Sequence, residues 1–340
     1  MAEGGEAMDP LDEIEDQLMI FSRTHLADPF AKVVSLEPGP GHAGFSYLFD
    51  VSTEGELRRY FLRMPPPNVK HEGTADVLRQ VSALRALDET TVPHAPVIWA
   101  GDDLQWFGRP YFIVPRIEGD VLRGDYALGF DEAQRRSMAV QAMTALAGIH
   151  KVDAATRCPY LGDFWGFEFD VTRWDRFYEK AADQELLALQ PTVRQKLLER
   201  IPAGARIALY HGDFQFANMM FSENAQLLAV IDWELCGQGA ILNDVGWICA
   251  FNEPEAWAHA GAVSGLMPHS DELEAFYREA YGDEVGDIRW FKALAMYKFA
   301  IISGFNLMLH RRGKRDDPHW EEMRPSMKSN MDFALKMLSD

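Results

Sequence analysis

The sequence predicts an α+β protein in which a small sheet-rich lobe precedes a larger helical lobe. Between residues 31 and 115, short runs of alternating apolar and polar residues are separated by turns rich in Gly and Pro, which is typical of strands. After about residue 120, apolar residues recur every three or four positions, which is typical of helices. The chain has 340 residues, of which 47% are hydrophobic. This length exceeds what one core usually holds, so two domains or lobes are expected.

Residues 1–30 are predicted to contain an N-terminal helix, because "LDEIEDQLMIFSRTHL" carries apolar residues at helical spacing. Residues 31–115 are predicted to form the sheet-rich N-lobe. Its first strands are "AKVVSL", "FSYLFDVST" and "LRRYFLRMP", and the last two are joined by a turn at residues 53–55. A helix is predicted over residues 74–88. Two more strands follow in "PVIWAGDD" and "RPYFIVPRIEG".

Residues 116–340 are predicted to form the helical C-lobe. The segment "DEAQRRSMAVQAMTALAGIH" opens with Asp131, a residue type that often caps the start of a helix. Further helices are predicted over residues 171–190, 191–200 and 290–308. Between them, "MMF" and "LLAVID" predict a hairpin that turns at residues 222–225.

The composition excludes several classes of protein. The net charge is −19, whereas a nucleic-acid binder normally has a basic face, so no nucleic-acid partner is expected. The three cysteines are odd in number and form no C-x-x-C pair, which favours a reducing compartment over disulfides or zinc. The N-terminal "MAEGGEAMDPLDEIEDQ" lacks the apolar stretch of a signal peptide, and the run "FAIISGFNLML" is too short to span a bilayer. The sequence therefore predicts a cytoplasmic protein without a membrane partner.

A glycine-rich loop follows the first predicted strand. Gly39, Gly41 and Gly44 form a G-x-G-x-x-G that leads into another strand, "FSYLFDV", and not into the helix of a dinucleotide-binding unit. A strand, a glycine loop and a second strand suit a flap over nucleotide phosphates, because glycine lets backbone N–H groups approach phosphate oxygens closely. The alternative is an ordinary hairpin rich in Gly and Pro.

A cluster of polar groups interrupts the helical lobe in "LYHGDFQFANMMF". Asp213 and Asn218 lie five positions apart, and the predicted hairpin would bring Asn218 near Asp232 at its other end. Phosphoryl transfer needs such groups, because Mg²⁺ prefers carboxylate and amide oxygens and a further carboxylate must meet the attacking hydroxyl. The alternative is that Asp213 caps a turn and the other two side chains decorate a hairpin.

Three motifs in this region resemble those of the aminoglycoside phosphotransferase family. "HGDFQFAN" is similar to the family's catalytic loop, "VIDWE" to its metal-binding segment, and "GQGAILNDVGW" to the segment that follows. "FLRMPPP", "VPHAPVIWAGDD" and "RPYFIVPRIEG" resemble the subgroup related to kinase-like domains fused to some acyl-CoA dehydrogenases. The resemblance implies a protein-kinase-like two-lobed fold. Residues 31–115 would then bind ATP, and residues 116–340 would carry the catalytic loop and the acceptor site.

The resemblance also implies a role for individual residues. Asp213 would be the catalytic base, Asn218 and Asp232 would bind Mg²⁺, and His211 and Asp244 would support the loop structurally. The residues expected to contact ATP are Gly41, Gly44, Ser46, Arg63, Val114 and Arg116.

The sequence departs from the family at two positions of the nucleotide site. Arg63 stands where the phosphate-binding lysine is usual, and arginine can also bind phosphate. Gln80 stands where the glutamate partner of that lysine is usual. Arg63 would then pair with Gln80, or in its place with a carboxylate such as Glu72.

The acceptor is expected to be a small hydroxylated molecule of apolar or acyl type, with Trp247 and Phe305 in contact with it. Aminoglycoside kinases need acidic pockets for polyamines, whereas the last predicted helix carries few carboxylates and ends in "HRRGKR". Three alternatives stay open: a nucleotide-binding pseudokinase or regulatory module, a true aminoglycoside kinase, and a hydrolase using His211 and Asp213. The oligomeric state is not predicted.

Overall fold

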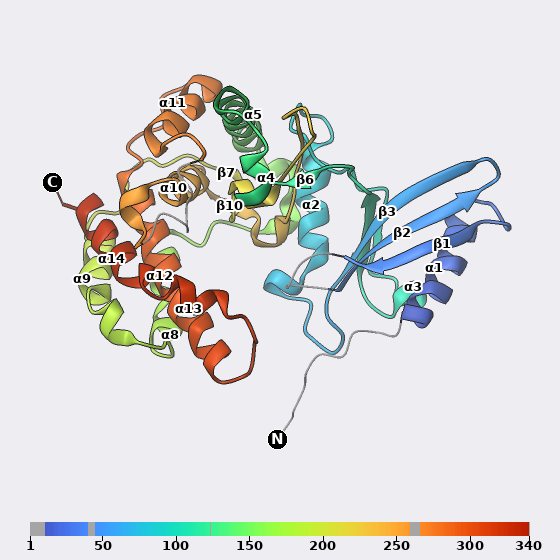
Figure 1. Ribbon diagram of the computed structural model, residues 1–340, viewed down its shortest axis with the longest axis horizontal. Coiled ribbons are helices and arrows are strands. Elements are labelled where there is room, and N and C mark those ends of the chain that lie inside the picture. The colour runs from blue at the N-terminus through green and yellow to red at the C-terminus, as the bar shows by residue number, and fades with distance from the viewer. Residues whose placement is uncertain (1–10, 40–44, 123, 259–265, 340) are drawn as a thin grey trace.

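The computed structural model describes residues 11–39, 45–122, 124–258 and 266–339. Figure 1 shows a sheet-rich lobe built from the first part of the chain, a larger helical lobe built from the rest, and helix α2 (Val77–Leu87) between them. The predicted α+β architecture with a small N-lobe and a helical C-lobe is therefore confirmed.

The N-lobe is a five-stranded antiparallel sheet with the strand order β1-β2-β3-β5-β4. The strands are β1 (Lys32–Pro38), β2 (Phe45–Thr53), β3 (Glu56–Met64), β4 (Trp99–Gly101) and β5 (Tyr111–Pro115). β2 and β3 pair along their whole length, from Thr53 opposite Glu56 to Phe45 opposite Met64. The short turn at residues 53–55 is thus where the sequence predicts it.

The two faces of this sheet pack against different partners, because side chains alternate between faces along each strand. Helix α1 (Leu11–His25) covers one face, where Phe21 packs with Tyr47, Leu62 and Ile113 in a separate apolar cluster. The short helix α3 (Leu104–Phe107) adds to this side. The opposite face, which carries Val114, packs toward α2 and the helical lobe.

The chain crosses between the lobes after β5. This strand ends at Pro115, and the expected lobe boundary at residues 115 and 116 stays a prediction. The short strand β6 (Asp120–Val121) then pairs with β8 (Met219–Phe221) of the helical lobe. One continuous segment therefore connects the sheet of the N-lobe to the hairpin that carries the predicted metal ligands.

The helical lobe contains α4 to α14 and two small sheets. Helix α5 begins with a capping box, in which the Asp131 side chain accepts from the Gln134 backbone and the Gln134 side chain accepts in return. The helices are α4 (Gly124–Leu128), α5 (Glu132–His150), α6 (Ala154–Arg157), α7 (Phe167–Thr172), α8 (Asp175–Tyr178), α9 (Gln190–Glu199), α10 (Leu242–Phe251), α11 (Ser270–Tyr281), α12 (Arg289–Arg311), α13 (His319–Met323) and α14 (Ser326–Met337). The remaining strands are β7 (Ile207–Tyr210), β9 (Leu227–Val230) and β10 (Gly237–Ala240), and 3₁₀ turns span Gly73–Ala75, Pro159–Leu161, Gln184–Leu187, Phe216–Asn218, Trp233–Leu235 and Pro254–Ala256.

The prediction of one helix over residues 171–190 is wrong. This segment is divided into the end of α7, the single-turn helix α8 and a 3₁₀ turn. Asp183 adopts a left-handed backbone conformation with φ of 50°, which no α-helix accommodates. Its carboxylate is held there by Arg311, at 2.8 Å, and by Arg324. Ion pairs with distant residues therefore override the local helical pattern.

Helix α12 runs through the core of the helical lobe and packs on α10 and α14. Among the described residues it is the one helix that is long and apolar enough to cross a membrane by length and composition, but 61% of its apolar window is buried inside the protein. The apolar residues of α12 are therefore explained by its packing inside the fold.

Candidate active site

The start of the loop from His211 to Asn218 is held by hydrogen bonds to Asp244 of α10. The Asp244 carboxylate accepts hydrogen bonds from the backbone N–H groups of His211, at 2.6 Å, and Gly212, at 2.8 Å. It also lies 3.2 Å from Nε2 of His150 on α5. Gly212 has φ of +91°, and a Cβ added to it would lie 2.3 Å from the carbonyl oxygen of Leu235. Only glycine therefore fits at this position. These contacts fix the direction in which the loop leaves β7.

Asp244 is fully buried, and its charge is stabilised by its neighbours. Burial alone would raise the pKa of the Asp244 carboxyl. The hydrogen bond and charge of His150, together with the contacts from His211, outweigh burial and hold that pKa below its usual value. Asp244 is therefore an ionised acceptor for the two loop N–H groups.

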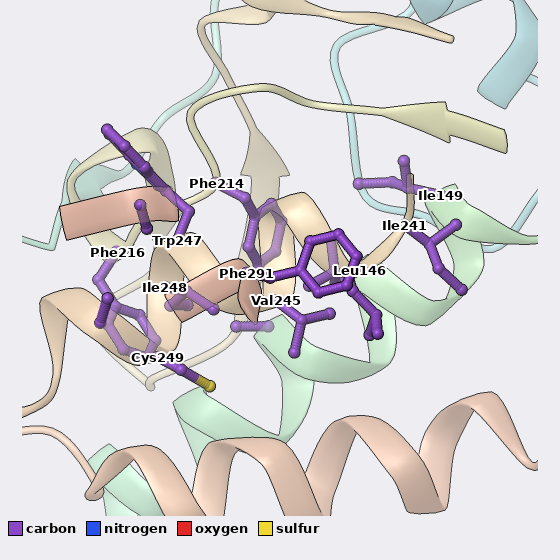
Figure 2. Packing of buried hydrophobic residues seen from close by; sticks show 14 of the residues in the cluster. Leu146, Ile149, Phe214, Phe216, Ile241, Val245, Trp247, Ile248, Cys249 and Phe291 are labelled. Atoms are coloured by element: carbon purple, nitrogen blue, oxygen red, sulfur yellow. The ribbon is translucent and has the colours of Figure 1, made fainter. Parts of the chain in front are cut away.

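Apolar residues hold the same loop against the helical core. Phe214 and Phe216 belong to the cluster that contains Val245, Ile248 and Phe291, as Figure 2 shows. The His211 ring is fully buried, with Nε2 2.8 Å from the carbonyl oxygen of Ile231. Since His211 is enclosed in this way, it shapes the loop and connects it to the segment before Asp232.

The side chain of Asp213 is partly buried and receives three side-chain hydrogen bonds. Its Oδ1 accepts from Nε1 of Trp247, at 2.7 Å, and from Nε2 of Gln215, at 2.8 Å. Its Oδ2 accepts from Nδ2 of Asn218, at 2.8 Å. An ionised carboxylate offers about four acceptor positions, so these three donors leave about one for a further hydroxyl.

Asn218 and Asp232 lie at the two ends of the hairpin formed by β8 and β9, as expected. Ile231 N–H donates to the Asn218 carbonyl at 2.9 Å. Nδ2 of Asn218 donates to both the carbonyl and the carboxylate of Asp213, which directs the amide oxygen Oδ1 away from them. Asp232 adopts a left-handed conformation with φ of 64°, and its carboxylate has no hydrogen-bond or ion-pair partner among the described residues. These two oxygen donors fit Mg²⁺, which commonly takes one or two protein ligands besides phosphate and water.

The electrostatics around Asp232 agree with a cation site. Burial, chiefly, and the nearby Asp213 raise the pKa of the Asp232 carboxyl, while Arg63 opposes this shift. A bound cation would reverse that shift, because it favours the ionised form. No cluster of three or more His, Cys, Asp or Glu side chains suited to a metal occurs within the described part of the chain, so a metal here would depend on other oxygen ligands.

Arg63 pairs with a residue that the sequence analysis did not assign. Its Nη2 lies 3.0 Å from Oε2 of Glu234, in the 3₁₀ turn that follows Asp232. The expected pairing with Gln80 is therefore wrong. The alternative of a carboxylate partner is confirmed, but that partner is Glu234 and not Glu72. Gln80 is buried on α2, and its Nε2 has no hydrogen-bond partner among the described residues. The carboxylate partner of Arg63 therefore comes from the helical lobe and not from α2.

Burial outweighs the attraction of Arg63 in setting the pKa of Glu234. Burial, chiefly, and the neighbouring charge of Asp232 raise the pKa of Glu234 from 4.5 to about 7, although Arg63 lowers it. Arg315, in the segment after α12, also acts to lower it. Glu234 therefore changes its charge within the physiological range.

The other residues expected to contact the nucleotide lie on the N-lobe side of this pair. Ser46 is buried and stands directly opposite Arg63 in the β2–β3 ladder, so both side chains share one face of the sheet. Val114 is buried on β5, and the Arg116 backbone N–H donates to the Arg59 carbonyl at 3.0 Å. Gly41 and Gly44 lie outside the described residues. The nucleotide contacts of all these residues stay predictions.

Of the two residues expected at the acceptor, the structure brings one to Asp213. Trp247 donates to Asp213 and also belongs to an aromatic cluster with Phe251 and Phe299, whose rings lie 5.0 Å and 6.2 Å from it. Phe305 lies further along α12 than Phe299, and its ring contact is with Phe177, at 5.0 Å. Contact of either residue with an acceptor stays a prediction.

The fold and this site define a protein of the kinase-like class. A five-stranded antiparallel sheet is joined to a helical lobe, and the side chains of Asp213, Asn218 and Asp232 lie near the Arg63–Glu234 pair that connects the lobes. The sequence model of the phosphotransferase enzyme family matches residues 40–280. The chain belongs to this family.

The curated relatives agree with the expected subgroup. Acyl-CoA dehydrogenase family member 10 of Mus musculus is 26% identical over 243 residues, which are 71% of this chain and 22% of that protein. Acyl-CoA dehydrogenase family member 11 of Homo sapiens is 25% identical over 258 residues, which are 73% of this chain and 33% of that protein. The chain thus spans a third or less of these relatives' length. The predicted resemblance to kinase-like domains of such proteins is confirmed.

Solved structures confirm the kinase-like fold. A structure from Ralstonia eutropha JMP134, described as an aminoglycoside phosphotransferase, aligns with a TM-score of 0.75 and 22% identity over 94% of this chain and 98% of that one. The GDP complex of aminoglycoside 2'-phosphotransferase-IIIa aligns with a TM-score of 0.65 and 14% identity, again over 94% and 98%. At these sequence identities, the structural similarity shows that the fold is shared.

Proposed function

We propose that this protein is an ATP-dependent kinase that transfers the γ-phosphoryl group to a hydroxyl of a small molecule. The observation that carries the proposal is the Asp213 carboxylate, whose three side-chain donors leave about one acceptor position for a hydroxyl. A carboxylate so oriented can accept the hydroxyl proton and hold the attacking oxygen in line with the phosphoryl group.

The remaining residues would bind and orient the nucleotide. Arg63, on the face of the sheet that packs toward the helical lobe, would contact its phosphates. Asn218 and Asp232 would hold Mg²⁺, which offsets the charge of the transferring phosphoryl oxygens. Nucleotide binding is supported by relatives of the same fold that were crystallised with GDP, with ADP, or with AMP-PNP and hygromycin B.

For the acceptor we propose an apolar or acyl-type molecule in place of a polycationic aminoglycoside. An aromatic cluster adjoins Asp213, since Trp247, Phe251, Phe299 and Trp257 pack ring against ring and Trp247 donates to Asp213. Such rings bind alkyl and acyl groups well and offer no charge to a polyamine.

A reducing, cytoplasmic location is supported by the three cysteines, which are all buried and free.

The proposal is tested by measuring Mg·ATP binding calorimetrically and then ATP consumption with alcohols, hydroxy acids and amino sugars. We expect turnover with the first two classes and none with Asp213→Asn, which should still bind Mg·ATP. Binding without turnover on any acceptor would favour a pseudokinase. Turnover restricted to amino sugars would identify an aminoglycoside kinase. No nucleotide binding would refute the proposal altogether.

A further inference from the structure

The turn after Asp232 is held by helix α2 as well as by the sheet. Nε of Arg79, on α2, donates to the carbonyl oxygen of Cys236 at 2.6 Å, across 157 positions of the sequence. Cys236 directly follows the 3₁₀ turn Trp233–Leu235 and is fully buried. Its thiol donates weakly in return to the Arg79 carbonyl, with Sγ 3.7 Å from the oxygen. The end of this turn is therefore joined to α2 by hydrogen bonds in both directions.

The guanidinium of Arg79 lies against the backbone at the start of β10. A Cβ added to Gly237 would lie 2.8 Å from Nη2 of Arg79 and 3.0 Å from the ring of Tyr210. Gly237 pairs with Tyr210, which ends β7 directly before the loop that carries Asp213. Glycine therefore lets the guanidinium approach a point that adjoins both the turn after Asp232 and the start of the Asp213 loop.

Helix α2 is itself bound to the helical lobe. Asp76 caps its first turn by accepting from the backbone N–H groups of Leu78 and Arg79. The same Oδ1 accepts from the hydroxyl of Tyr160, at 3.2 Å, in the 3₁₀ turn Pro159–Leu161. Figure 1 shows α2 between the two lobes. Arg79 therefore extends from a helix whose first turn is fixed to the lobe that carries the candidate site.

Two arginines from different elements hold one short segment. Arg63 of β3 lies 3.0 Å from the carboxylate of Glu234, and Arg79 of α2 binds the carbonyl of Cys236 two residues later. Between these points Trp233 is buried, and its indole N–H donates at 3.0 Å to the strand that precedes the turn. The segment is thus fixed from the sheet, from α2 and from the core.

We propose that Arg79 is a positioning residue for Asp232, the proposed Mg²⁺ ligand, and that it acts through the turn that follows this ligand. The inference rests on the proposed function, because it takes Asp232 as a ligand of the Mg²⁺ bound with ATP. Asp232 has a left-handed backbone with φ of 64°. A residue other than glycine keeps such a conformation where its surroundings hold it, and the hydrogen bond from Arg79 to Cys236 is part of that support.

This role explains how α2 contributes to the site without a carboxylate. Gln80 carries no charge with which to pair Arg63, whereas the preceding residue, Arg79, binds the turn. Arg63 binds the same turn through Glu234. The sheet and α2 are thus both connected to the segment that begins with Asp232, and displacement of either would shift that ligand.

The test measures calorimetrically how the full chain binds ATP with Mg²⁺ and ATP with EDTA. Arg79→Met should lower the affinity for Mg·ATP about tenfold, as expected for a lost hydrogen bond from a charged group, and that for metal-free ATP by no more than about threefold. Arg79→Lys keeps a cationic donor and should recover part of the loss. Arg85, exposed on the same helix, provides the matched control, and Arg85→Met should bind as the wild type does.

Gly237→Ala displaces the Arg79 guanidinium without removing it, because the new Cβ would meet Nη2. This variant should also weaken Mg·ATP binding more than metal-free binding, and combining it with Arg79→Met should cost no more than Arg79→Met alone. In the nucleotide-free protein, amide exchange of residues 232–236 should be faster in Arg79→Met than in the wild type. If Arg79→Met does not fold, Arg79→Lys and Gly237→Ala decide.

Equal losses of affinity with and without Mg²⁺ would overturn the inference. Lower stability of Arg79→Met with unchanged Mg·ATP binding would do the same, because Arg79 would then only attach α2 to the helical lobe. Fully additive losses in the double variant would also contradict it. These outcomes leave the kinase proposal standing, since turnover of an acceptor decides that separately. If the wild type binds Mg·ATP but turns over no acceptor, the binding data still decide the role of Arg79. Absence of Mg·ATP binding in the wild type refutes both.

Discussion

Nη2 of Arg63, on the third strand of the N-lobe, lies 3.0 Å from Oε2 of Glu234, in the turn after Asp232. The side chains are 12% and 17% exposed, so this ion pair is largely shielded from water, in contrast to most others in the protein. It connects the two lobes directly at the place where the nucleotide phosphates are proposed to bind. Because α2 carries no carboxylate, Glu234 is the residue that positions the Arg63 guanidinium.

Glu234→Gln should weaken Mg·ATP binding more than it slows phosphoryl transfer. The amide keeps the shape of the side chain but removes the charge that fixes Arg63. We expect KM for ATP to rise about tenfold, which corresponds to the ~1.5 kcal/mol of a hydrogen bond to a charged group. Steady-state kinetics at varied ATP measure this. The exposed pair of Glu56 and Arg58 provides the control, and Glu56→Gln should change nothing. Tighter ATP binding in Glu234→Gln would show that Glu234 competes with the phosphates.

The same carboxylate should make the stability of the nucleotide-free protein depend on pH. The pKa of Glu234 is about 7 when folded and close to 4.5 when unfolded, so the folded state binds more protons between these values. Its contribution to the free energy of unfolding is therefore fully present below about pH 4.5 and is lost as the pH rises to 7. Glu234→Gln should flatten this slope in urea unfolding followed from pH 5 to 8. An unchanged slope in the variant would contradict the raised pKa.

Trp247→Phe tests the hydrogen bond to Asp213 separately from the aromatic surface. Phenylalanine keeps a ring beside Phe251 but cannot donate to Oδ1 of Asp213. We expect kcat to fall about tenfold, because one donor to a charged carboxylate contributes about 1.5 kcal/mol to its orientation. KM for ATP should stay the same, since Trp247 is proposed to contact the acceptor and not the nucleotide. A rise in KM for ATP with unchanged kcat would place this residue in a different role.

Local pattern was sufficient to predict most of the N-lobe. The strand predicted in "FSYLFDVST" coincides with β2, Phe45–Thr53, because alternate residues such as Tyr47 and Phe49 are apolar and meet the same buried face. The hairpin around residues 222–225 was predicted for a similar reason, and it placed Asn218 and Asp232 at its two ends.

Contacts between distant segments could not be predicted in this way. Arg63 and Glu234 are 171 positions apart, and their pairing depends on how the lobes meet. The hydrogen bond from Trp247 to Asp213 likewise depends on the packing of α10 beneath the loop.

Asp244→Asn should destabilise the fold and the catalytic loop together. The buried carboxylate serves the N–H groups of His211 and Gly212 and faces His150, whereas an asparagine amide would direct an NH₂ group at one of these donors. Removal of one partner from a buried charged network costs about 3 kcal/mol or more of unfolding free energy. Urea unfolding measures this loss.

The matched control for Asp244→Asn is Asp175→Asn, which breaks a carboxylate–arginine pair whose side chains are 37% and 33% exposed. That variant should cost no more than about 1 kcal/mol, because water already screens the pair. Turnover should fall in Asp244→Asn even at temperatures where the variant is folded, since the backbone that carries Asp213 is no longer fixed. Equal stability of the two variants would show that Asp244 does not organise the loop. A stability loss with full activity in the folded fraction would show that the loop keeps its shape without it.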